Sequence, residues 1–178
     1  MTHRLLAVLA VGALLAAPAS TRAQSTSILV SGGLSVPMSD LSDVSNSGYN
    51  VNVGLAFGAP LVPFGARIEG GFSSFDAKGG GATTRVASAT ANAVLGLGTG
   101  GASPYLIGGV GIYNRRFSSD VFDASDSRTA AGVNVGGGIR FPLGGISTFL
   151  EARYHFMLGS SDEATNLQFI PISFGVQF

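Results

Sequence analysis

The C-terminal segment of this chain alternates large apolar residues with small or polar ones without interruption. The apolar residues take every second position: Ile170, Ile172, Phe174, Val176 and Phe178. Side chains along a β-strand point alternately to its two faces, so this segment predicts a strand with one wholly apolar face. A bare Phe as the final residue, with no polar tail, is unusual for a soluble sheet. It favours a barrel wall in contact with lipid.

Seven earlier segments share this period of two. The eight expected strands cover about residues 27–36, 49–57, 64–75, 84–97, 105–117, 130–141, 146–157 and 167–178. Tilted strands of roughly ten residues can cross the apolar band of about 25 Å of an outer-membrane barrel. The 27 glycines, spread through the apolar segments, disfavour helices and suit strands that bend. The predicted fold is an all-β, eight-stranded antiparallel up-and-down transmembrane β-barrel.

The connections between these segments alternate in length and charge. Short turns, at 59–63, 98–101 and 142–145, carry no charged residue. Longer polar connections, at about 37–48, 76–83, 118–129 and 158–166, hold eight of the ten acidic residues. Short turns on the periplasmic side and longer loops outside are typical of outer-membrane barrels.

The first 23 residues have the features of a secretory signal peptide. His3 and Arg4 give a basic start, an apolar stretch follows, and small residues ending at Ala23 suit cleavage. We expect residues 1–23 to be removed and residues 24–178 to form the barrel domain. The mature chain would then have eight basic and ten acidic residues, which argues against a nucleic-acid partner. The absence of Cys excludes lipoprotein attachment and disulfide bonds.

Composition allows one alternative to the membrane barrel. Charged residues make up only 11% of the chain, well below the roughly 25% usual for soluble domains. Beyond the leader, no apolar run approaches the roughly 20 residues that a helical span needs. Such a chain has either a large buried core or an outer surface that faces lipid. The alternative is therefore a secreted or periplasmic lipocalin-like barrel that binds a small apolar ligand, with every apolar face turned inward.

Aromatic residues near the ends of the apolar faces predict the girdles that lie at the level of lipid headgroups. Tyr49 and Phe57 are eight residues apart in the second segment, and Tyr105 and Tyr113 repeat that spacing in the fifth. The fifth segment has apolar residues on both faces, and this spacing places Tyr105, Ile107 and Tyr113 outside. The predicted girdle comprises Tyr49, Phe57, Tyr105, Tyr113, Tyr154 and Phe156.

Three stretches carry a resemblance to a known family: GGGIRFPLGG (136–145), FLEARYH (149–155) and FIPISFGVQF (169–178). They resemble the bacterial outer-membrane β-barrel domain family, small eight-stranded barrels similar to the OmpA membrane domain, OmpX and the opacity proteins. The resemblance implies an outer-membrane location, a structural, surface-interaction or minor small-solute pore role, no enzyme activity and no cofactor. It also implies insertion by the outer-membrane assembly machinery, which would read Phe174, Val176 and Phe178 in the last strand. We expect a monomer surrounded by outer-membrane lipids and lipopolysaccharide.

Charged residues lie on the polar faces of the segments, where the lumen of a barrel would be. They are Arg67, Glu69, Arg140, Glu151, Arg153 and, as the only histidine after the leader, His155. An eight-stranded barrel is just wide enough for side chains to fill it. Isolated buried charges are costly, so these must pair. They predict either a structural plug of Arg–Glu pairs or a gate whose pairs exchange partners to open a narrow pore. Three arginines against two glutamates would give such a pore a weak preference for anions.

Catalytic and metal sites have little support in the sequence. His155 would need a nucleophile such as Ser160 or Ser161 and an orienting carboxylate. The segment that follows it lacks the serine that the outer-membrane deacylase pattern requires. One histidine and no Cys leave no zinc ligand set, and the acidic residues of 120–126 lack the Gly and Glu of an EF-hand loop. We therefore expect no catalytic residue, no cofactor and no metal site.

Overall fold

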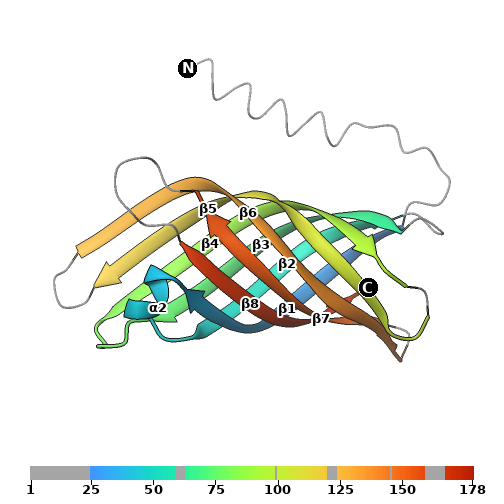
Figure 1. Ribbon diagram of the computed structural model, residues 1–178, viewed down its shortest axis with the longest axis horizontal. Coiled ribbons are helices and arrows are strands. Elements are labelled where there is room, and N and C mark those ends of the chain that lie inside the picture. Colours follow the sequence, from blue (N-terminus) through green and yellow to red (C-terminus); the bar gives the residue numbers. More distant parts are fainter. Residues whose placement is uncertain (1–24, 59–62, 99, 120–123, 145, 159–166) are drawn as a thin grey trace, which may run out of the picture.

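The computed structural model describes residues 25–58, 63–98, 100–119, 124–144, 146–158 and 167–178. They form a closed barrel in which each strand pairs antiparallel with its sequence neighbours (Figure 1). The last strand pairs with the first, from Leu29 opposite Gln177 to Met38 opposite Gln168, and this closes the cylinder. The predicted eight-stranded antiparallel up-and-down barrel is confirmed.

Except for the start of β6, the strands have bounds close to those expected from the alternation. They are β1 (Ser25–Met38), β2 (Gly48–Gly58), β3 (Phe64–Asp76), β4 (Ala82–Gly96), β5 (Ser103–Ser119), β6 (Ala124–Leu143), β7 (Ile146–Met157) and β8 (Gln168–Gln177). A single turn of helix, α2 (Asp40–Val44), lies between β1 and β2. No helix in the described part of the chain is long and apolar enough to cross a membrane.

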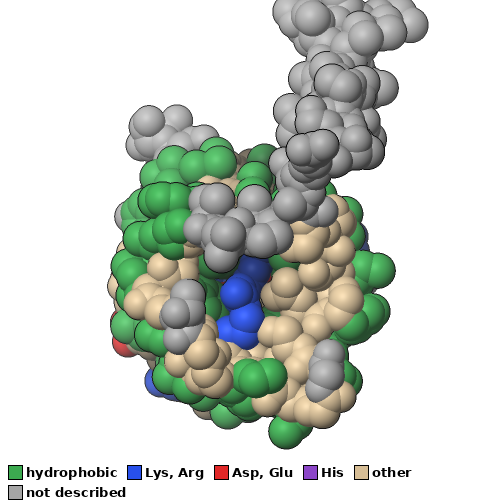
Figure 2. All heavy atoms as spheres, turned by 90° about the vertical axis from the view of Figure 1, so that its right-hand side faces the viewer, with side chains coloured by type: hydrophobic (Ala, Val, Ile, Leu, Met, Phe, Trp, Pro, Cys, Tyr) green, Lys and Arg blue, Asp and Glu red, His purple; other side chains and the backbone are tan. Residues whose placement is uncertain are grey.

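The apolar faces of the strands point outward. Val53, Leu150 and Phe174 are 57%, 50% and 49% exposed, whereas Glu69 and Arg153 are each 4% exposed in the interior. Apolar side chains accordingly cover much of the outer wall seen from one end (Figure 2). A soluble barrel that binds an apolar ligand needs the opposite arrangement, so the lipocalin-like alternative is wrong for this chain.

The predicted facing of β5 is wrong. Tyr105, Ile107 and Tyr113 are at most 2% exposed inside the barrel, and the alternate residues, such as Val110 and Ile112, lie outside at 62% and 61%. The two faces of this strand are equally apolar in sequence, so hydrophobicity alone does not decide between them. The tyrosine hydroxyl groups favour the inward position, because each one hydrogen-bonds to a polar side chain on β7. Tyr105 bonds to Glu151 and Tyr113 to His155.

The expected loop at 118–129 is largely a hairpin. β5 continues to Ser119 and β6 starts at Ala124, and the two strands remain paired beyond Asn114 opposite Thr129. Polar residues occupy both faces there, so no alternation of hydrophobicity marks the strands. The turn itself and the expected signal peptide lie outside the described residues.

The interior has two apolar layers with a polar layer between them. The first apolar layer lies near the short turns and consists of the buried side chains of Leu29, Ala56, Val94, Tyr105, Ile107 and Phe149. Near the long loops, a second layer contains Leu41, Phe75, Val86, Tyr113, Met157, Leu167 and Phe169. Leu41 reaches the second layer from α2, which therefore helps to close the long-loop end.

Candidate functional site

Two strands on opposite sides of the barrel supply the charges of the polar layer. Arg67 and Glu69 occupy successive inward positions of β3, and Glu151 and Arg153 do the same on β7. β3 and β7 are four strands apart in the closed order of eight, so their inward side chains meet across the lumen. Residues 84 positions apart in sequence thereby come into contact.

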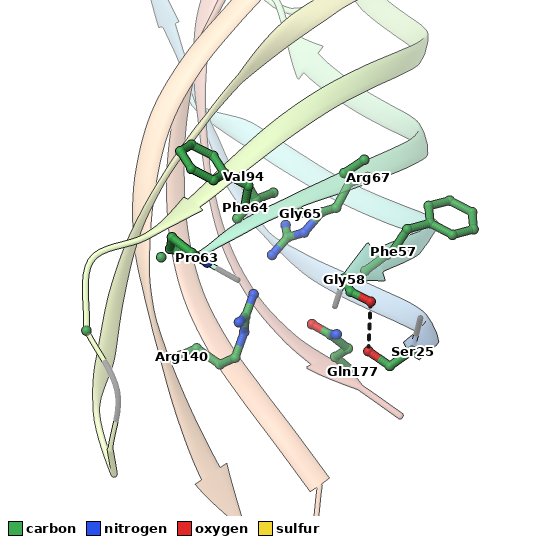
Figure 3. A pocket seen from close by; sticks show the side chains of 14 residues that line it. Ser25, Phe57, Gly58, Pro63, Phe64, Gly65, Arg67, Val94, Arg140 and Gln177 are labelled. Carbon is green, nitrogen blue, oxygen red and sulfur yellow. Dashed lines mark hydrogen bonds between the residues drawn. The ribbon is translucent and has the colours of Figure 1, made fainter. Parts of the chain in front are cut away.

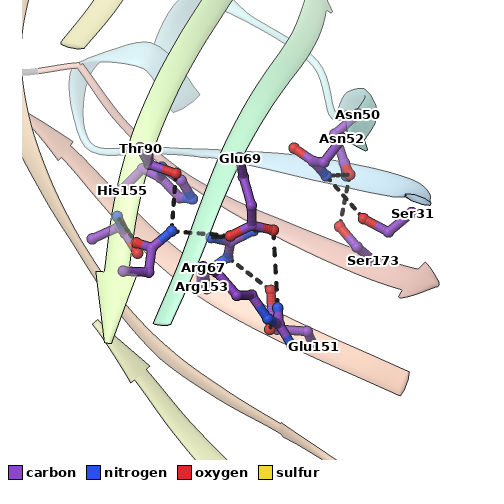
Figure 4. Close-up of polar contacts among 12 residues, drawn as sticks. Ser31, Asn50, Asn52, Arg67, Glu69, Thr90, Glu151, Arg153, His155 and Ser173 are labelled. Atoms are coloured by element: carbon purple, nitrogen blue, oxygen red, sulfur yellow. Dashed lines mark hydrogen bonds and ion pairs between the residues drawn. The ribbon is translucent and has the colours of Figure 1, made fainter. Parts of the chain in front are cut away.

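These four side chains form a ring of ion pairs (Figure 4). Arg67 Nη1 donates to Glu151 Oε2 at 2.8 Å. Arg153 donates two hydrogen bonds to Glu69, from Nη1 to Oε2 at 2.7 Å and from Nη2 to Oε1 at 3.1 Å. Arg153 Nε also lies 2.8 Å from Glu151 Oε1, as an ion pair without hydrogen-bond alignment. The ring closes with a 3.9 Å contact between Arg67 and Glu69.

Neutral donors complete the hydrogen bonding of both carboxylates. Tyr105 Oη donates to Glu151 Oε2 at 2.7 Å, and Asn92 Nδ2 donates to Glu69 Oε2 at 3.0 Å. All four charged side chains are at most 4% exposed. A buried ion pair is tolerated when further hydrogen bonds satisfy its remaining lone pairs, and that condition holds here for the carboxylates. The arrangement fills the middle of the lumen with matched charge.

Sequence reasoning missed the role of Tyr105 in this network. The guanidinium carbons of Arg67 and Arg140 lie 5.3 Å and 5.2 Å from the centre of its ring. Gly138 is its direct partner on β6, and a Cβ there would lie 2.6 Å from the phenol oxygen. The sequence contained a signal for the inward position of Tyr105. Buried carboxylates need hydrogen-bond donors, and Tyr is an aromatic residue that can donate.

His155 is buried inside the barrel, 5% exposed, but belongs to the long-loop layer rather than to the ion-pair ring. Its Nδ1 lies 2.9 Å from Tyr113 Oη, and its ring stacks on Phe169 at 4.9 Å. Its hydrogen-bond partner in the described structure is thus a phenol. The serines considered as nucleophiles, Ser160 and Ser161, lie outside the described residues. Among the residues described, no cluster of three metal-ligating side chains occurs.

Arg140 is separate from the ring and lies near the short turns of the barrel. It makes no ion pair with a described carboxylate, and its Nε is buried without a hydrogen-bond partner among the described residues. Together with Arg67 it points into an open cavity of about 550 Å³ (Figure 3). Figure 2, which looks into this end, shows basic side chains inside the opening. The six predicted lumen residues therefore fall into three places: four form the ion-pair ring, His155 lies on its long-loop side, and Arg140 lies at the short-turn mouth.

The remaining predicted residues lie mainly on the outer wall. Tyr49 is 54% exposed at the long-loop end of β2, and Phe57, Tyr154 and Phe156 are half-buried on outward faces. Tyr105 and Tyr113 do not belong to the girdle, because they fill the lumen. Of the expected assembly signal, Phe174 and Phe178 are 49% and 65% exposed, and Val176 is half-buried on the same face. Their reading by the assembly machinery stays a prediction.

Known structures share this architecture. The chain is similar to Neisserial surface protein A (17% identity, TM-score 0.66, 88% of this chain and 98% of that one). It is also similar to a major outer membrane protein of Thermus thermophilus (12%, 0.61, 88% and 99%). A third match is the N-terminal barrel of OprF from Pseudomonas aeruginosa (11%, 0.52, 88% and 100%). At these identities the likeness shows the fold.

The family of this chain is identified by sequence comparison. A search of curated protein sequences finds no significant match. The profile of the family described as "Outer membrane protein beta-barrel domain" matches residues 6–178, almost the whole chain. The chain therefore belongs to the outer-membrane β-barrel domain family and is an integral protein of the bacterial outer membrane.

Proposed function

We propose that this protein is a non-conducting membrane anchor that presents its long-loop end for surface interactions. The observation that carries the proposal is the ion-pair ring of Arg67, Glu69, Glu151 and Arg153 across the lumen. A solute path would have to pass between these side chains and then through the apolar layer around Phe75 and Phe169. The lumen thus supports a plug better than a gate.

The energetic cost of opening the ring supports the same proposal. Removing the partner of a buried charge costs roughly 3–5 kcal/mol. Each 1.4 kcal/mol is about a factor of ten in population, so a ring opened at one pair would occur in fewer than about one molecule in a hundred. An exchange of partners would avoid this cost only if another carboxylate were near. The interior of the described barrel offers Glu69 and Glu151, and both already lie in the ring.

Planar-bilayer recording tests the plug. Folded protein, verified by its heat-modifiable migration in gels, is expected to give no stable conductance steps, with a general porin in the same membrane as the positive control. Reproducible steps from folded protein would contradict the plug and favour the gated pore. Membrane incorporation is checked separately, by protease protection of the inserted barrel.

We also propose a non-enzymatic role. The family and the similar structures are outer-membrane barrel proteins rather than recognised enzymes. The chemistry around His155 supports this, since its neighbours Tyr113 and Phe169 provide a phenol and an apolar ring. A general base is useful to a hydrolase when it contacts a nucleophile and is oriented by a carboxylate. The described contacts of His155 include neither a nucleophile nor a carboxylate.

Lipopolysaccharide is the proposed lipid partner. Arg85 on β4 is paired in register with Arg116 on β5, and both side chains are exposed near the long-loop end. Arg85 shares the outward face with Ala87, because its neighbour Val86 is buried in the lumen. Like charges directly opposite destabilise a sheet unless an anion lies between them. The phosphates of lipopolysaccharide in the outer leaflet would provide that anion.

Thermal unfolding in detergent tests the lipid partner. Lipid A is expected to raise the unfolding temperature of the wild type, and Arg85→Gln/Arg116→Gln should lose most of the increase. Arg128→Gln is the matched control, because Arg128 is an exposed arginine that already pairs with Asp126 at 3.3 Å. Equal stabilisation of all three proteins would contradict an arginine-pair site. We further propose a monomer, since the closed strand order leaves no sheet edge within the membrane wall.

A further inference from the structure

Two arginines face the open cavity at the short-turn end of the barrel. The cavity has a volume of about 550 Å³, and the side chains of Arg67, Arg140 and Gln177 point toward it (Figure 3). A water molecule occupies about 30 Å³ of liquid, so the cavity has room for a polyatomic ion and its remaining water. Apolar groups such as Val94 and Ala56 complete the wall.

Three guanidinium nitrogens beside this cavity have no hydrogen-bond partner among the described residues. Arg67 is 1% exposed, and its Nε and Nη2 are buried without a hydrogen-bond partner in the described part of the chain. Arg140 Nε is in the same condition, and so is one acceptor of the lining, Gln177 Oε1. Buried polar groups in folded proteins nearly always find a partner, so several unpartnered N–H groups around one cavity indicate that something else accepts from them.

The charge balance at this end is positive. The described lining includes two arginines and no acidic residue. The three short turns carry no charge in the sequence, and Glu151, the acidic partner of Arg67, is also held by Arg153 and Tyr105. Among the described lumen residues, three arginines against two glutamates leave the charge of Arg140 unmatched. The cavity therefore favours an anion.

The two guanidinium groups are held in place before any ligand arrives. Both contact the ring of Tyr105, at 5.3 Å for Arg67 and 5.2 Å for Arg140. Arg67 is further fixed by the ring of Phe149 at 5.1 Å and by its ion pair with Glu151. The planar, many-donor geometry of guanidinium suits tetrahedral oxyanions and carboxylates.

We propose that the short-turn mouth is a binding site for a small oxyanion of the phosphate class, held by Arg140 and Arg67 with Gln177 at the rim. The ligand enters from the periplasmic side, where the short turns of such barrels lie. Its source is either free phosphate or the phosphate of a lipid headgroup, and the chemistry of the site is the same for both. The site shares Arg67 with the ion-pair ring, but the ligand needs no path through that ring.

Isotope-edited NMR of the folded protein in maltoside micelles tests the site. Inorganic phosphate is expected to shift the side-chain N–H resonances of Arg67 and Arg140 saturably, and Arg140→Gln to weaken binding at least tenfold. Arg128→Gln is the control, because it removes an exposed arginine that pairs with Asp126 near the opposite end and should leave the affinity unchanged. A parallel titration with a short-chain phosphatidate separates the sources. A response to phosphatidate alone assigns the headgroup.

A second measurement needs no variant and so does not depend on Arg140→Gln folding. Crystals of the wild type soaked in bromide should show an anomalous peak within hydrogen-bond distance of Arg140, at the place where phosphate binds. Non-saturable shifts that are equal in Arg140→Gln and Arg128→Gln would overturn the proposal, as would a mouth without a bromide peak. The cavity would then hold water only.

Discussion

In the long-loop half of the lumen, Leu41, Phe75 and Phe169 pack into an apolar layer, whereas the short-turn half ends in an open cavity that contains Arg67 and Arg140. The same barrel wall surrounds both, so the difference comes from the inward residues alone. Both halves contain buried aromatic rings, Phe75 and Phe169 in one and Tyr105 and Phe149 in the other, but the short-turn half also has arginines at its mouth. Charged side chains fill the lumen only when partners cross from the opposite wall. The lumen is therefore packed with apolar side chains near the long loops and open to solvent near the short turns.

Breaking the polar layer between the two halves is expected to have the largest effect. Glu151→Gln removes the partner of both Arg67 and Arg153 and leaves buried positive charge. The free energy of unfolding in lipid vesicles should fall by roughly 3–5 kcal/mol. Asp126→Asn is the matched control, because its pair with Arg128 is more than half exposed and should contribute about 0–1 kcal/mol. Similar losses in the two variants would show that the ring does not stabilise the barrel.

Opening the closed half tests the apolar layer. Phe75 is fully buried and packs edge-on against Phe169 with ring centres 5.7 Å apart. Phe75→Ala should cost roughly 3–5 kcal/mol of unfolding free energy, because it leaves a cavity. The lipid-facing Phe72→Ala in the same strand is the control, since lipid can fill the space it leaves. An equal loss at both positions would mean that the long-loop half is not a packed core.

Removing one hydroxyl between the two halves should have a smaller effect. Tyr105→Phe keeps the ring under Arg67 and Arg140 but removes the donor to Glu151. A hydrogen bond to a charged group is worth about 1.5–3 kcal/mol, and the unfolding free energy should fall within that range. Tyr49→Phe, on the exposed outer face, should change it little. If Tyr105→Phe also behaved as neutral, the donor would not be needed.

A single methyl group tests how closely the short-turn half is packed. A Cβ at Gly138 would lie 2.6 Å from the carbonyl oxygen of Leu150 and from Tyr105 Oη. Gly138→Ala should therefore cost about 1–3 kcal/mol in unfolding assays. At Gly108 the nearest atom would be 3.5 Å away, so Gly108→Ala should be tolerated. The reverse order of the two losses would contradict the inward position of Tyr105.

The elements that can be predicted from sequence are those whose two faces differ in polarity. β8 and β2 alternate cleanly, and the structure places their apolar faces outside as expected. The sequence assigns β5 to the wrong face because polarity does not distinguish its two sides. The start of β6, from Ala124 to Thr129, resembles a loop in sequence because it is polar on both sides.

The membership of the lumen is easier to predict than its pairing. The alternation of β3 and β7 is enough to place Arg67, Glu69, Glu151 and Arg153 inside. Which charge meets which depends on the closure of the barrel, since the partners are 84 residues apart. Arg140 shares the alternation but not the ring, because its position on β6 lies closer to the short turns. A pattern along one strand does not specify contacts across the cylinder.

The glycines that face the lumen tyrosines have a spectroscopic consequence. A Cβ at Gly132 would lie 2.7 Å from the ring of Tyr113, and one at Gly138 would meet the ring of Tyr105. The α-protons of these glycines therefore lie within the ring-current field of an aromatic neighbour. Their resonances should be displaced from ordinary strand values, one glycine reporting on the closed end of the lumen and the other on the open end. Each half could then be followed separately during insertion into a bilayer, without an introduced label.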